Sequence, residues 1–121
     1  MVKTHGLTHL ALSVRDPDVS LRFYYDVFGV QEYFRDETSI HVQIPDARDV
    51  ITFVRDGSTA GQAGGVMHFG FRLTDPADID LAVHEVEKAG GRILRQGEFG
   101  PGFPFAFIHD PDGYEVEIWF E

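Results

Sequence analysis

Apolar side chains follow two spacings along the chain, and each spacing predicts one kind of element. Alternation of every second residue, as at Leu10, Leu12 and Val14, predicts strands, whereas apolar positions three and four apart predict helices. Two helices are expected after Asp16-Pro17 and Asp75-Pro76, with the aspartates as N-caps, and each ends at a glycine, Gly29 and Gly90. Further strands are expected at about 30–35, 39–44, 50–55, 92–97, 104–109 and 114–120.

An internal repeat organises these elements. GLTHLALSVRDP from Gly6 and GVMHFGFRLTDP from Gly65 share Gly, His, Asp and Pro at one constant separation of 59 residues. The pattern predicts a single α+β domain, 1–121, of two βαβββ modules at about 6–55 and 65–121, with a Gly-rich linker at 56–64. The modules are expected to pair into a curled mixed β-sheet around a central cavity. A ferredoxin-like sandwich with a coincidental repeat is the alternative.

Strand alternation predicts which side chains face that cavity. His9, His68 and Glu117 each fall on the side of their strand opposite the apolar set, and Thr52 takes the place of Glu117 in the first copy. Two imidazoles and one carboxylate are donors that suit a divalent transition metal and leave positions open for water or substrate. Either histidine taken alone would more often be a hydrogen-bonded core residue than a metal ligand. The repeat and the carboxylate in register favour the metal site.

Other candidate residues lie on the same strands. His41 and His109 can exchange protons near neutral pH. Phe105 and Phe107 share the alternation phase of His109, so they are expected either to form an apolar pocket wall or to be core residues.

Composition narrows the classes of partner. The 121 residues suit one domain, and 20 acidic against 10 basic residues give a formal charge of −10, which disfavours nucleic acid and anionic membranes as partners. The chain has no Cys, so a metal must be held by imidazole and carboxylate. No apolar run approaches the roughly 20 residues that span a bilayer, and a cytoplasmic location is expected.

Three segments, GLTHLALSVRDPDVSLRFYYDVFGV, GVMHFGFRL and HDPDGYEVEIWF, resemble the vicinal oxygen chelate superfamily of glyoxalases, bleomycin-resistance proteins and extradiol dioxygenases. The resemblance implies the glyoxalase-like fold, metal ligands at His9, His68 and Glu117, and a substrate that chelates the metal through two adjacent oxygens. Glyoxalase I is similar in its first three ligands but adds a fourth, a Glu or Gln, where this chain has Thr52. That departure argues against glyoxalase I activity.

The resemblance favours an Fe²⁺ enzyme, an extradiol-type dioxygenase, acting on a small molecule, and a homodimer. His109, His41 and Tyr114 are the expected proton carriers. Residues expected to contact the substrate are Phe105, Phe107, Trp119, Arg72 and Thr52. Two alternatives stay open: a lyase or isomerase using Zn²⁺, Ni²⁺ or Mn²⁺, and a non-catalytic binder of antibiotics or other small ligands. Whether His9 comes from the same chain as His68 and Glu117 also stays open.

Overall fold

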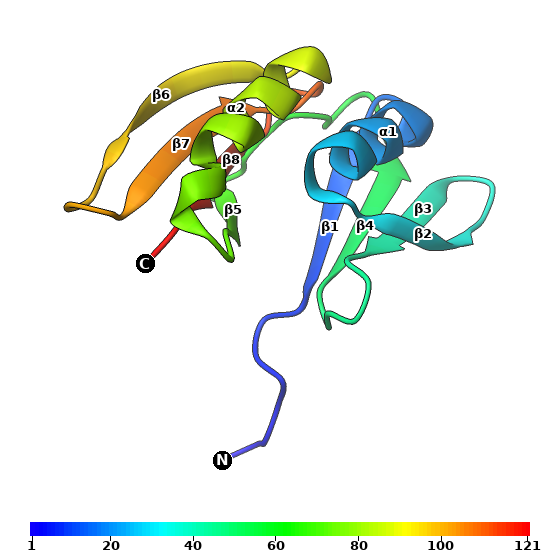
Figure 1. Cartoon of the computed structure of the whole chain (residues 1–121). Coiled ribbons are helices and arrows are strands. Elements are labelled where there is room, and N and C mark those ends of the chain that lie inside the picture. The colour runs from blue at the N-terminus through cyan, green and yellow to red at the C-terminus, as the bar shows by residue number, and fades with distance from the viewer. The chain divides into compact units, whose positions relative to one another are not determined.

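The computed structural model describes residues 1–121 and folds them into two α+β units (Figure 1). One unit comprises Met1–Ala60 and the other Gly61–Glu121, so the boundary between them falls within the expected linker. Each unit has its own four-stranded mixed sheet. None of the helices has the length and apolar character needed to cross a bilayer.

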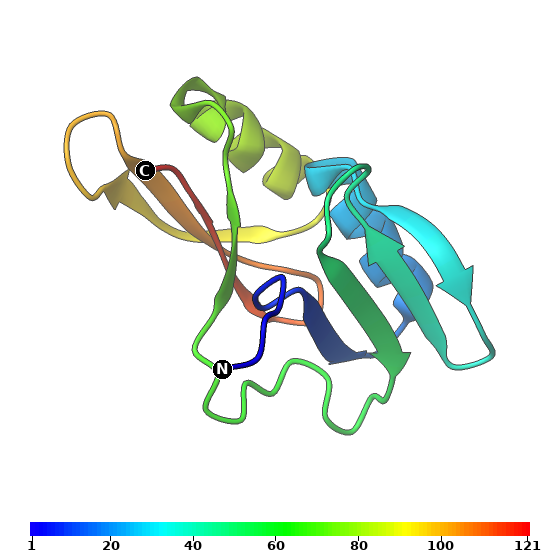
Figure 2. The same cartoon turned by 90° about the horizontal axis from the view of Figure 1, so that it is seen from below.

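The first unit follows the order βαβββ. Its elements are β1 (His9–Val14), α1 (Pro17–Phe28), β2 (Gln31–Arg35), β3 (Ser39–Gln43) and β4 (Val50–Arg55). The strand order in the sheet is β1-β4-β3-β2, with β1 parallel to β4 and the other pairs antiparallel. Helix α1 packs on β3 and β4, and Figure 2 shows the same sheet turned by 90°.

Local chemistry fixes both ends of α1. The Asp16 side chain accepts a hydrogen bond from the Asp18 N–H, and Pro17 occupies the first helical position, where no N–H is needed. At the other end Gly29 adopts φ 72°, a left-handed conformation that glycine reaches without steric cost. Between these ends the helix buries Phe23 and Tyr24, and the Tyr24 ring lies 5.2 Å from that of Phe53 on β4. The predicted caps of this helix are confirmed.

The second unit repeats the order, except that a 3₁₀ turn precedes its α-helix. Its elements are β5 (Phe69–Arg72), a 3₁₀ turn η1 (Pro76–Asp78), α2 (Ile79–Lys88), β6 (Arg92–Glu98), β7 (Pro104–His109) and β8 (Glu115–Trp119). The strand order is β5-β8-β7-β6, again with one parallel pair, β5 with β8. Helix α2 packs on β6 and β7.

The start of the second helix differs from the prediction. Asp75 does cap the segment, accepting from the Ala77 N–H, but the first turn is 3₁₀, and the α-helix begins only at Ile79. The Asp78 N–H bonds back three residues to the Asp75 carbonyl at 3.1 Å, which tightens the turn. The α+β class and the two βαβββ modules are confirmed, whereas the cavity stays a prediction.

Candidate metal-binding residues

The second unit brings two of the three expected ligands together. Nε2 of His68, just before β5, lies 3.3 Å from Oε2 of Glu117 on β8, and the two side chains are 33% and 15% exposed. Nitrogen and oxygen donors about 2.1 Å from a shared ion lie roughly 3.0–3.4 Å apart. The His68–Glu117 pair therefore has the spacing of two ligands of one cation. Without a cation the same atoms can form a hydrogen bond.

A glycine beside Glu117 leaves room for this pair. Gly70 of β5 is the register partner of Glu117. A Cβ at Gly70 would lie 3.0 Å from the Glu117 carbonyl oxygen, 3.2 Å from Trp119 Nε1 and 3.3 Å from the Glu117 Cβ. A side chain there would crowd the Glu117 backbone, the Glu117 Cβ and the indole, so the absence of a Cβ leaves room for Glu117 in its present place.

Aromatic rings border the pair. Phe107 of β7 faces Glu117 in register, is buried, and meets the His68 ring edge-on with centroids 5.0 Å apart. Phe105 lies 5.6 Å from Phe107, and Phe99 stacks on Phe105 at 4.5 Å. The two phenylalanines expected in a pocket wall thus lie on β7, the strand next to the one that carries Glu117.

A small hollow opens beside Glu117. It has a volume of about 260 Å³ and is lined by Phe99, Glu117, Trp119 and Glu121. The Arg72 guanidinium lies 5.3 Å from the centre of the Trp119 ring and donates a hydrogen bond to the Glu121 carbonyl. Trp119 therefore lines this hollow directly, whereas Arg72 supports its wall.

The first unit places His9 in the corresponding arrangement. Its Nε2 lies 3.1 Å from Oγ1 of Thr52 on β4, just as His68 Nε2 lies near Glu117 on β8. Thr52 is buried, and its Oγ1 also lies 3.4 Å from Nδ1 of His41 on β3. His41 is therefore joined to His9 through one hydroxyl.

The other two expected proton carriers lie farther along the second sheet. His109 pairs in register with Glu115, two residues from Glu117, and its Nδ1 accepts a hydrogen bond from Arg92 at 3.2 Å. Tyr114 lies in the turn before β8, where its N–H donates to the Asp110 carboxylate at 2.9 Å.

No three His, Asp or Glu side chains gather in the structure as a metal-binding group. His9 belongs to the first unit, and His68 and Glu117 belong to the second. The complete three-ligand set therefore stays a prediction.

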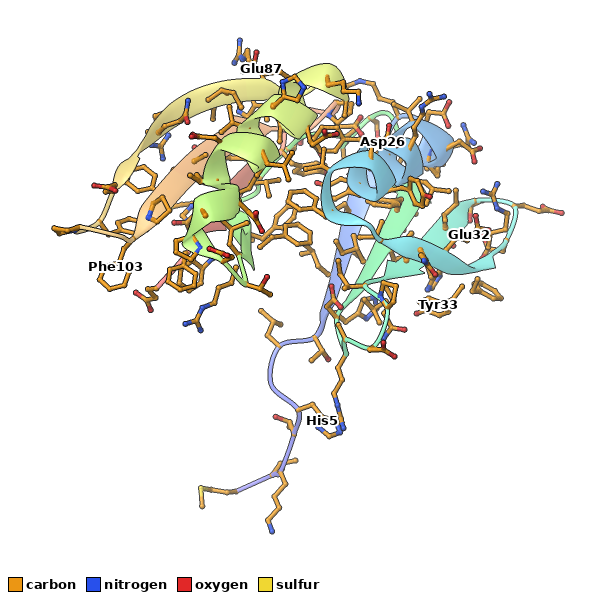
Figure 3. The ribbon with its side chains drawn as sticks, in the orientation of Figure 1. His5, Asp26, Glu32, Tyr33, Glu87 and Phe103 are labelled. Atoms are coloured by element: carbon orange, nitrogen blue, oxygen red, sulfur yellow. The ribbon has the colours of Figure 1, made fainter.

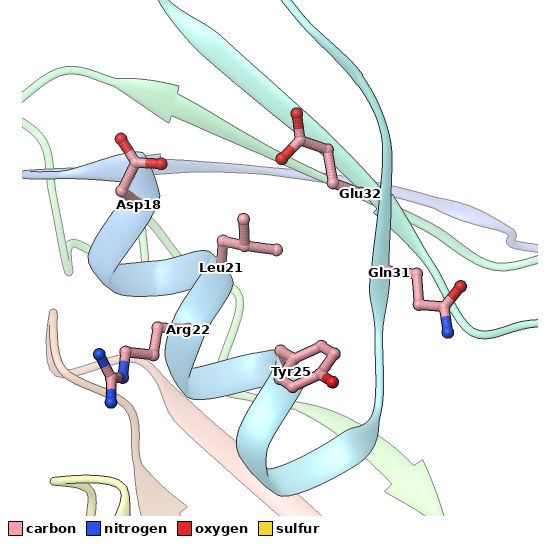
Figure 4. Close-up of a pocket in the computed structure, with 6 residues that line it drawn as sticks. All are labelled: Asp18, Leu21, Arg22, Tyr25, Gln31 and Glu32. Atoms are coloured by element: carbon pink, nitrogen blue, oxygen red, sulfur yellow. The ribbon is translucent and has the colours of Figure 1, made fainter.

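A second hollow lies in the first unit, between α1 and β2 (Figure 4). Its volume is about 350 Å³, and its lining residues are Asp18, Leu21, Arg22, Tyr25, Gln31 and Glu32. Arg35 bonds to both Asp18, at 2.9 Å, and Glu32, at 2.6 Å, and the bond from Arg35 lowers the pKa of the Glu32 carboxyl. The hollow includes none of the residues predicted for the site.

One residue near the site, Arg95, was missed at the sequence level. Arg95 places its guanidinium 3.9 Å from the centre of the Phe107 ring and bonds to Glu115 at 3.0 Å. Strand alternation could have found Arg95 only if the irregular register of β6 at Ile93/Arg95 were known. A further histidine, His5, lies on the N-terminal segment that precedes β1 (Figure 3), where its ring is within hydrogen-bonding distance of Arg48.

Comparison with known proteins identifies the class. The family model of the Glyoxalase/Bleomycin resistance protein/Dioxygenase superfamily matches residues 6–118, and the chain belongs to that family. Members typically use a divalent metal and commonly act as small-ligand binders and dimers.

Individual relatives differ in their activities. The chain is 28% identical to the metapyrocatechase of Geobacillus stearothermophilus over 95% of its own length, but it spans only 34% of that protein. It is 27% identical to the lactoylglutathione lyase of Haemophilus influenzae, covering 93% of this chain and 90% of the lyase. A glyoxalase-related enzyme from Fulvimarina pelagi shares the fold, with TM-score 0.79, 23% identity and coverage of 98% and 89%. Membership of the family therefore does not fix the reaction.

Proposed function

We propose that this protein is a metal-dependent enzyme whose ion is held by His9, His68 and Glu117. Its substrate is a small molecule that binds the ion through two adjacent oxygens, and the reaction is an extradiol-type dioxygenation with Fe²⁺. The observation that carries the proposal is the 3.3 Å separation of His68 Nε2 and Glu117 Oε2, which suits two ligands of one cation. His9, in the equivalent place of the repeat, supplies the third donor.

The donor set matches this chemistry. Two neutral imidazoles and one carboxylate leave a divalent ion with a net positive charge and open positions, as in non-haem Fe²⁺ oxygenases. When bound, such an ion supplies Lewis-acid polarisation of the substrate oxygens and, as Fe²⁺, activation of O₂. Thr52 adds no charge to the set, in contrast to a fourth carboxylate.

The chain's own residues supply the rest of the site. Phe105 and Phe107 form an apolar border beside Glu117, and Trp119 lines the hollow next to it, which together suit a small apolar or aromatic substrate. His41, linked to His9 through Thr52, is the proton carrier best placed in the first unit, and His109 and Tyr114 remain candidates in the second. Arg72 and Thr52 complete the set of residues proposed to contact the substrate.

Metal analysis of freshly purified protein tests the ligand set. We expect close to one divalent metal per site, with Fe²⁺ favoured over Zn²⁺, Ni²⁺ and Mn²⁺, and we expect it to be lost in His9→Ala, His68→Ala and Glu117→Gln. His84→Ala is the matched control, since His84 is an exposed histidine on α2. Unchanged metal content in all three ligand variants would refute the proposal, and metal-free protein that still binds small ligands would favour the non-catalytic binder.

Oxygen consumption tests the reaction. Protein reconstituted anaerobically with Fe²⁺ is mixed with O₂ and a panel of catechols, and we expect O₂ uptake with ring-opened products. No uptake across the panel would contradict the dioxygenase.

A lyase is the second candidate, because the curated lyase matches this chain over 90% of its own length, although Thr52 in the place of a fourth ligand argues against the glyoxalase I reaction. It would use Zn²⁺, Ni²⁺ or Mn²⁺ on the same ligands. Formation or breakdown of S-lactoylglutathione by the metal-loaded protein, without O₂ consumption, would support it.

We also propose that the protein is a homodimer, as members of its family commonly are. Sedimentation equilibrium should give a mass twice that of the 13.6 kDa chain. A mass of one chain at all concentrations would contradict this proposal.

A further inference from the structure

A chain of polar side chains runs through the first unit from His9 to Asp36. His9 Nε2 lies 3.1 Å from Thr52 Oγ1, and Thr52 Oγ1 lies 3.4 Å from His41 Nδ1. On the far side of the ring, His41 Nε2 lies 3.4 Å from Ser39 Oγ, which bonds to Asp36 Oδ1 at 3.0 Å. Imidazoles and hydroxyls thus alternate across β1, β4 and β3.

Asp36 anchors one end of this chain. Its Oδ1 accepts hydrogen bonds from the backbone N–H groups of Thr38 and Ser39 and from the Ser39 hydroxyl. The bonds from Thr38 and Ser39 lower the pKa of the Asp36 carboxyl. An ionised carboxylate can only accept, and a serine has one hydroxyl hydrogen, so that hydrogen points to Asp36.

This anchor sets the direction of every other bond. Because the Ser39 hydrogen is engaged, Ser39 Oγ can only accept from His41, which places a proton on His41 Nε2. A neutral His41 then has a lone pair on Nδ1 and accepts the single hydroxyl hydrogen of Thr52. Thr52 Oγ1 must in turn accept from His9, which places the His9 proton on Nε2.

The surroundings keep His41 in this orientation. Ser39 and Thr52, on either side of the ring, are both buried. The rings of Phe34 and Tyr33 meet His41 edge-on, with centroids 5.1 and 6.1 Å away. Rotation of the imidazole would break both hydrogen bonds at once.

We propose that Thr52 and His41 are positioning residues that hold His9, in the metal-free protein, in the tautomer with its proton on Nε2. The inference rests on the proposed function, because Nε2 is the nitrogen that corresponds to the His68 atom beside Glu117. A cation on His9 Nε2 must displace that proton and the hydrogen bond to Thr52. These hydrogen-bonded side chains therefore compete with the metal for His9 Nε2, and they keep the His9 ring oriented while no metal is bound.

Nitrogen NMR of the histidine rings tests the tautomer without any metal. Long-range ¹H–¹⁵N spectra of metal-free protein at pH 8.5 should show His9 protonated on Nε2. Thr52→Val, which keeps the side-chain shape, should give a mixture of His9 tautomers, and Thr52→Ser should restore the wild-type spectrum. Ser39→Ala removes the hydroxyl that links His41 to Asp36 but leaves the backbone bonds to Asp36, and it should release His41 and His9 together. A His9 ring protonated on Nδ1 in the wild-type protein would overturn the inference.

Metal affinity supplies a second test. Titration with Co²⁺ should show that Thr52→Val binds roughly two- to tenfold tighter than wild type, since one competing hydrogen bond is removed. Thr52→Ser should bind like wild type, and far-UV circular dichroism checks that each variant is folded. Weaker binding by Thr52→Val would overturn the inference and make the hydroxyl itself a ligand. If wild-type protein binds no Co²⁺, the proposed function fails, while the NMR result still decides the role of the chain.

Discussion

Gly70 has no Cβ, and this leaves space beside Glu117 on the neighbouring strand. A methyl group there would come within 3.0–3.3 Å of the Glu117 backbone and Cβ and of the Trp119 indole. We expect Gly70→Ala to cost about 1–3 kcal/mol of stability, as overpacking does, and to lower the affinity for the proposed metal by shifting the Glu117 backbone and Cβ. Thermal unfolding and Co²⁺ titration measure the two effects. Gly57→Ala is the matched control, because a Cβ at Gly57 meets nothing within 4 Å; equal effects of both substitutions would contradict the steric account.

Asp36 should make the stability of the protein depend on acid pH. Hydrogen bonds from Thr38 and Ser39 lower the pKa of its carboxyl in the folded state. A carboxyl with a lowered folded pKa stabilises the fold above its unfolded pKa of about 3.9, and this contribution is lost as the pH falls through the folded pKa. Asp36→Asn should therefore unfold at a lower temperature than wild type at pH 7, and the difference should shrink toward pH 3.

The exposed neighbour Glu37 provides the control for that measurement. Glu37→Gln should leave the pH dependence of the unfolding midpoint nearly unchanged. A gap between wild type and Asp36→Asn that stays constant from pH 7 to pH 3 would show that the carboxylate charge is not involved.

For single residues, the sequence could predict the strand face on which a side chain lies better than the hydrogen-bond partners of that side chain. Alternation along the strands was enough to expect His9 and Thr52 on one face, because side-chain direction in a strand has a period of two. The link from His41 through Ser39 to Asp36 depends on an Asx turn between β2 and β3, whose bonds are visible only in the structure. Likewise, the irregular register of β6 that brings Arg95 over Phe107 leaves no mark in hydrophobic periodicity.

Among the elements, the turn from β7 into β8 fixes the strand that carries Glu117. Asp110 is buried and accepts hydrogen bonds from the N–H groups of Asp112 and Tyr114 at 3.0 and 2.9 Å. Asp110→Ala would leave both donors without this acceptor, so we expect a loss of about 1–3 kcal/mol in the free energy of unfolding. Urea denaturation measures it. Asp80→Ala, at an exposed position on α2, should cost far less, and a loss of similar size there would contradict the account.

Element boundaries were predictable where local chemistry decides them. The capping side chain of Asp16 and the left-handed Gly29 fix α1 within its own sequence. The 3₁₀ turn after Asp75 was missed, because the same Asp-Pro signal precedes both helices and the choice between a three-residue and a four-residue hydrogen bond is a fine balance.

For the whole molecule, the repeat preserves the backbone while the two copies differ in chemistry. Each copy places a histidine Nε2 close to one side chain of its parallel partner strand, at 3.1 Å in the first unit and 3.3 Å in the second. In one copy that side chain is the neutral Thr52, and in the other it is the acidic Glu117. We therefore expect the two equivalent positions to offer the proposed metal one carboxylate rather than two.

If the protein binds the proposed metal, removing that metal should destabilise the whole fold. An ion that binds only the folded state adds about 2.7 kcal/mol at a concentration 100 times its dissociation constant. For a chain of 121 residues we expect a chelator to lower the thermal unfolding midpoint by roughly 10 °C. Glu117→Gln removes the anionic ligand, so its midpoint should be insensitive to the chelator, whereas His84→Ala should respond like wild type. A chelator effect of equal size in Glu117→Gln would place the stabilising ion elsewhere in the molecule.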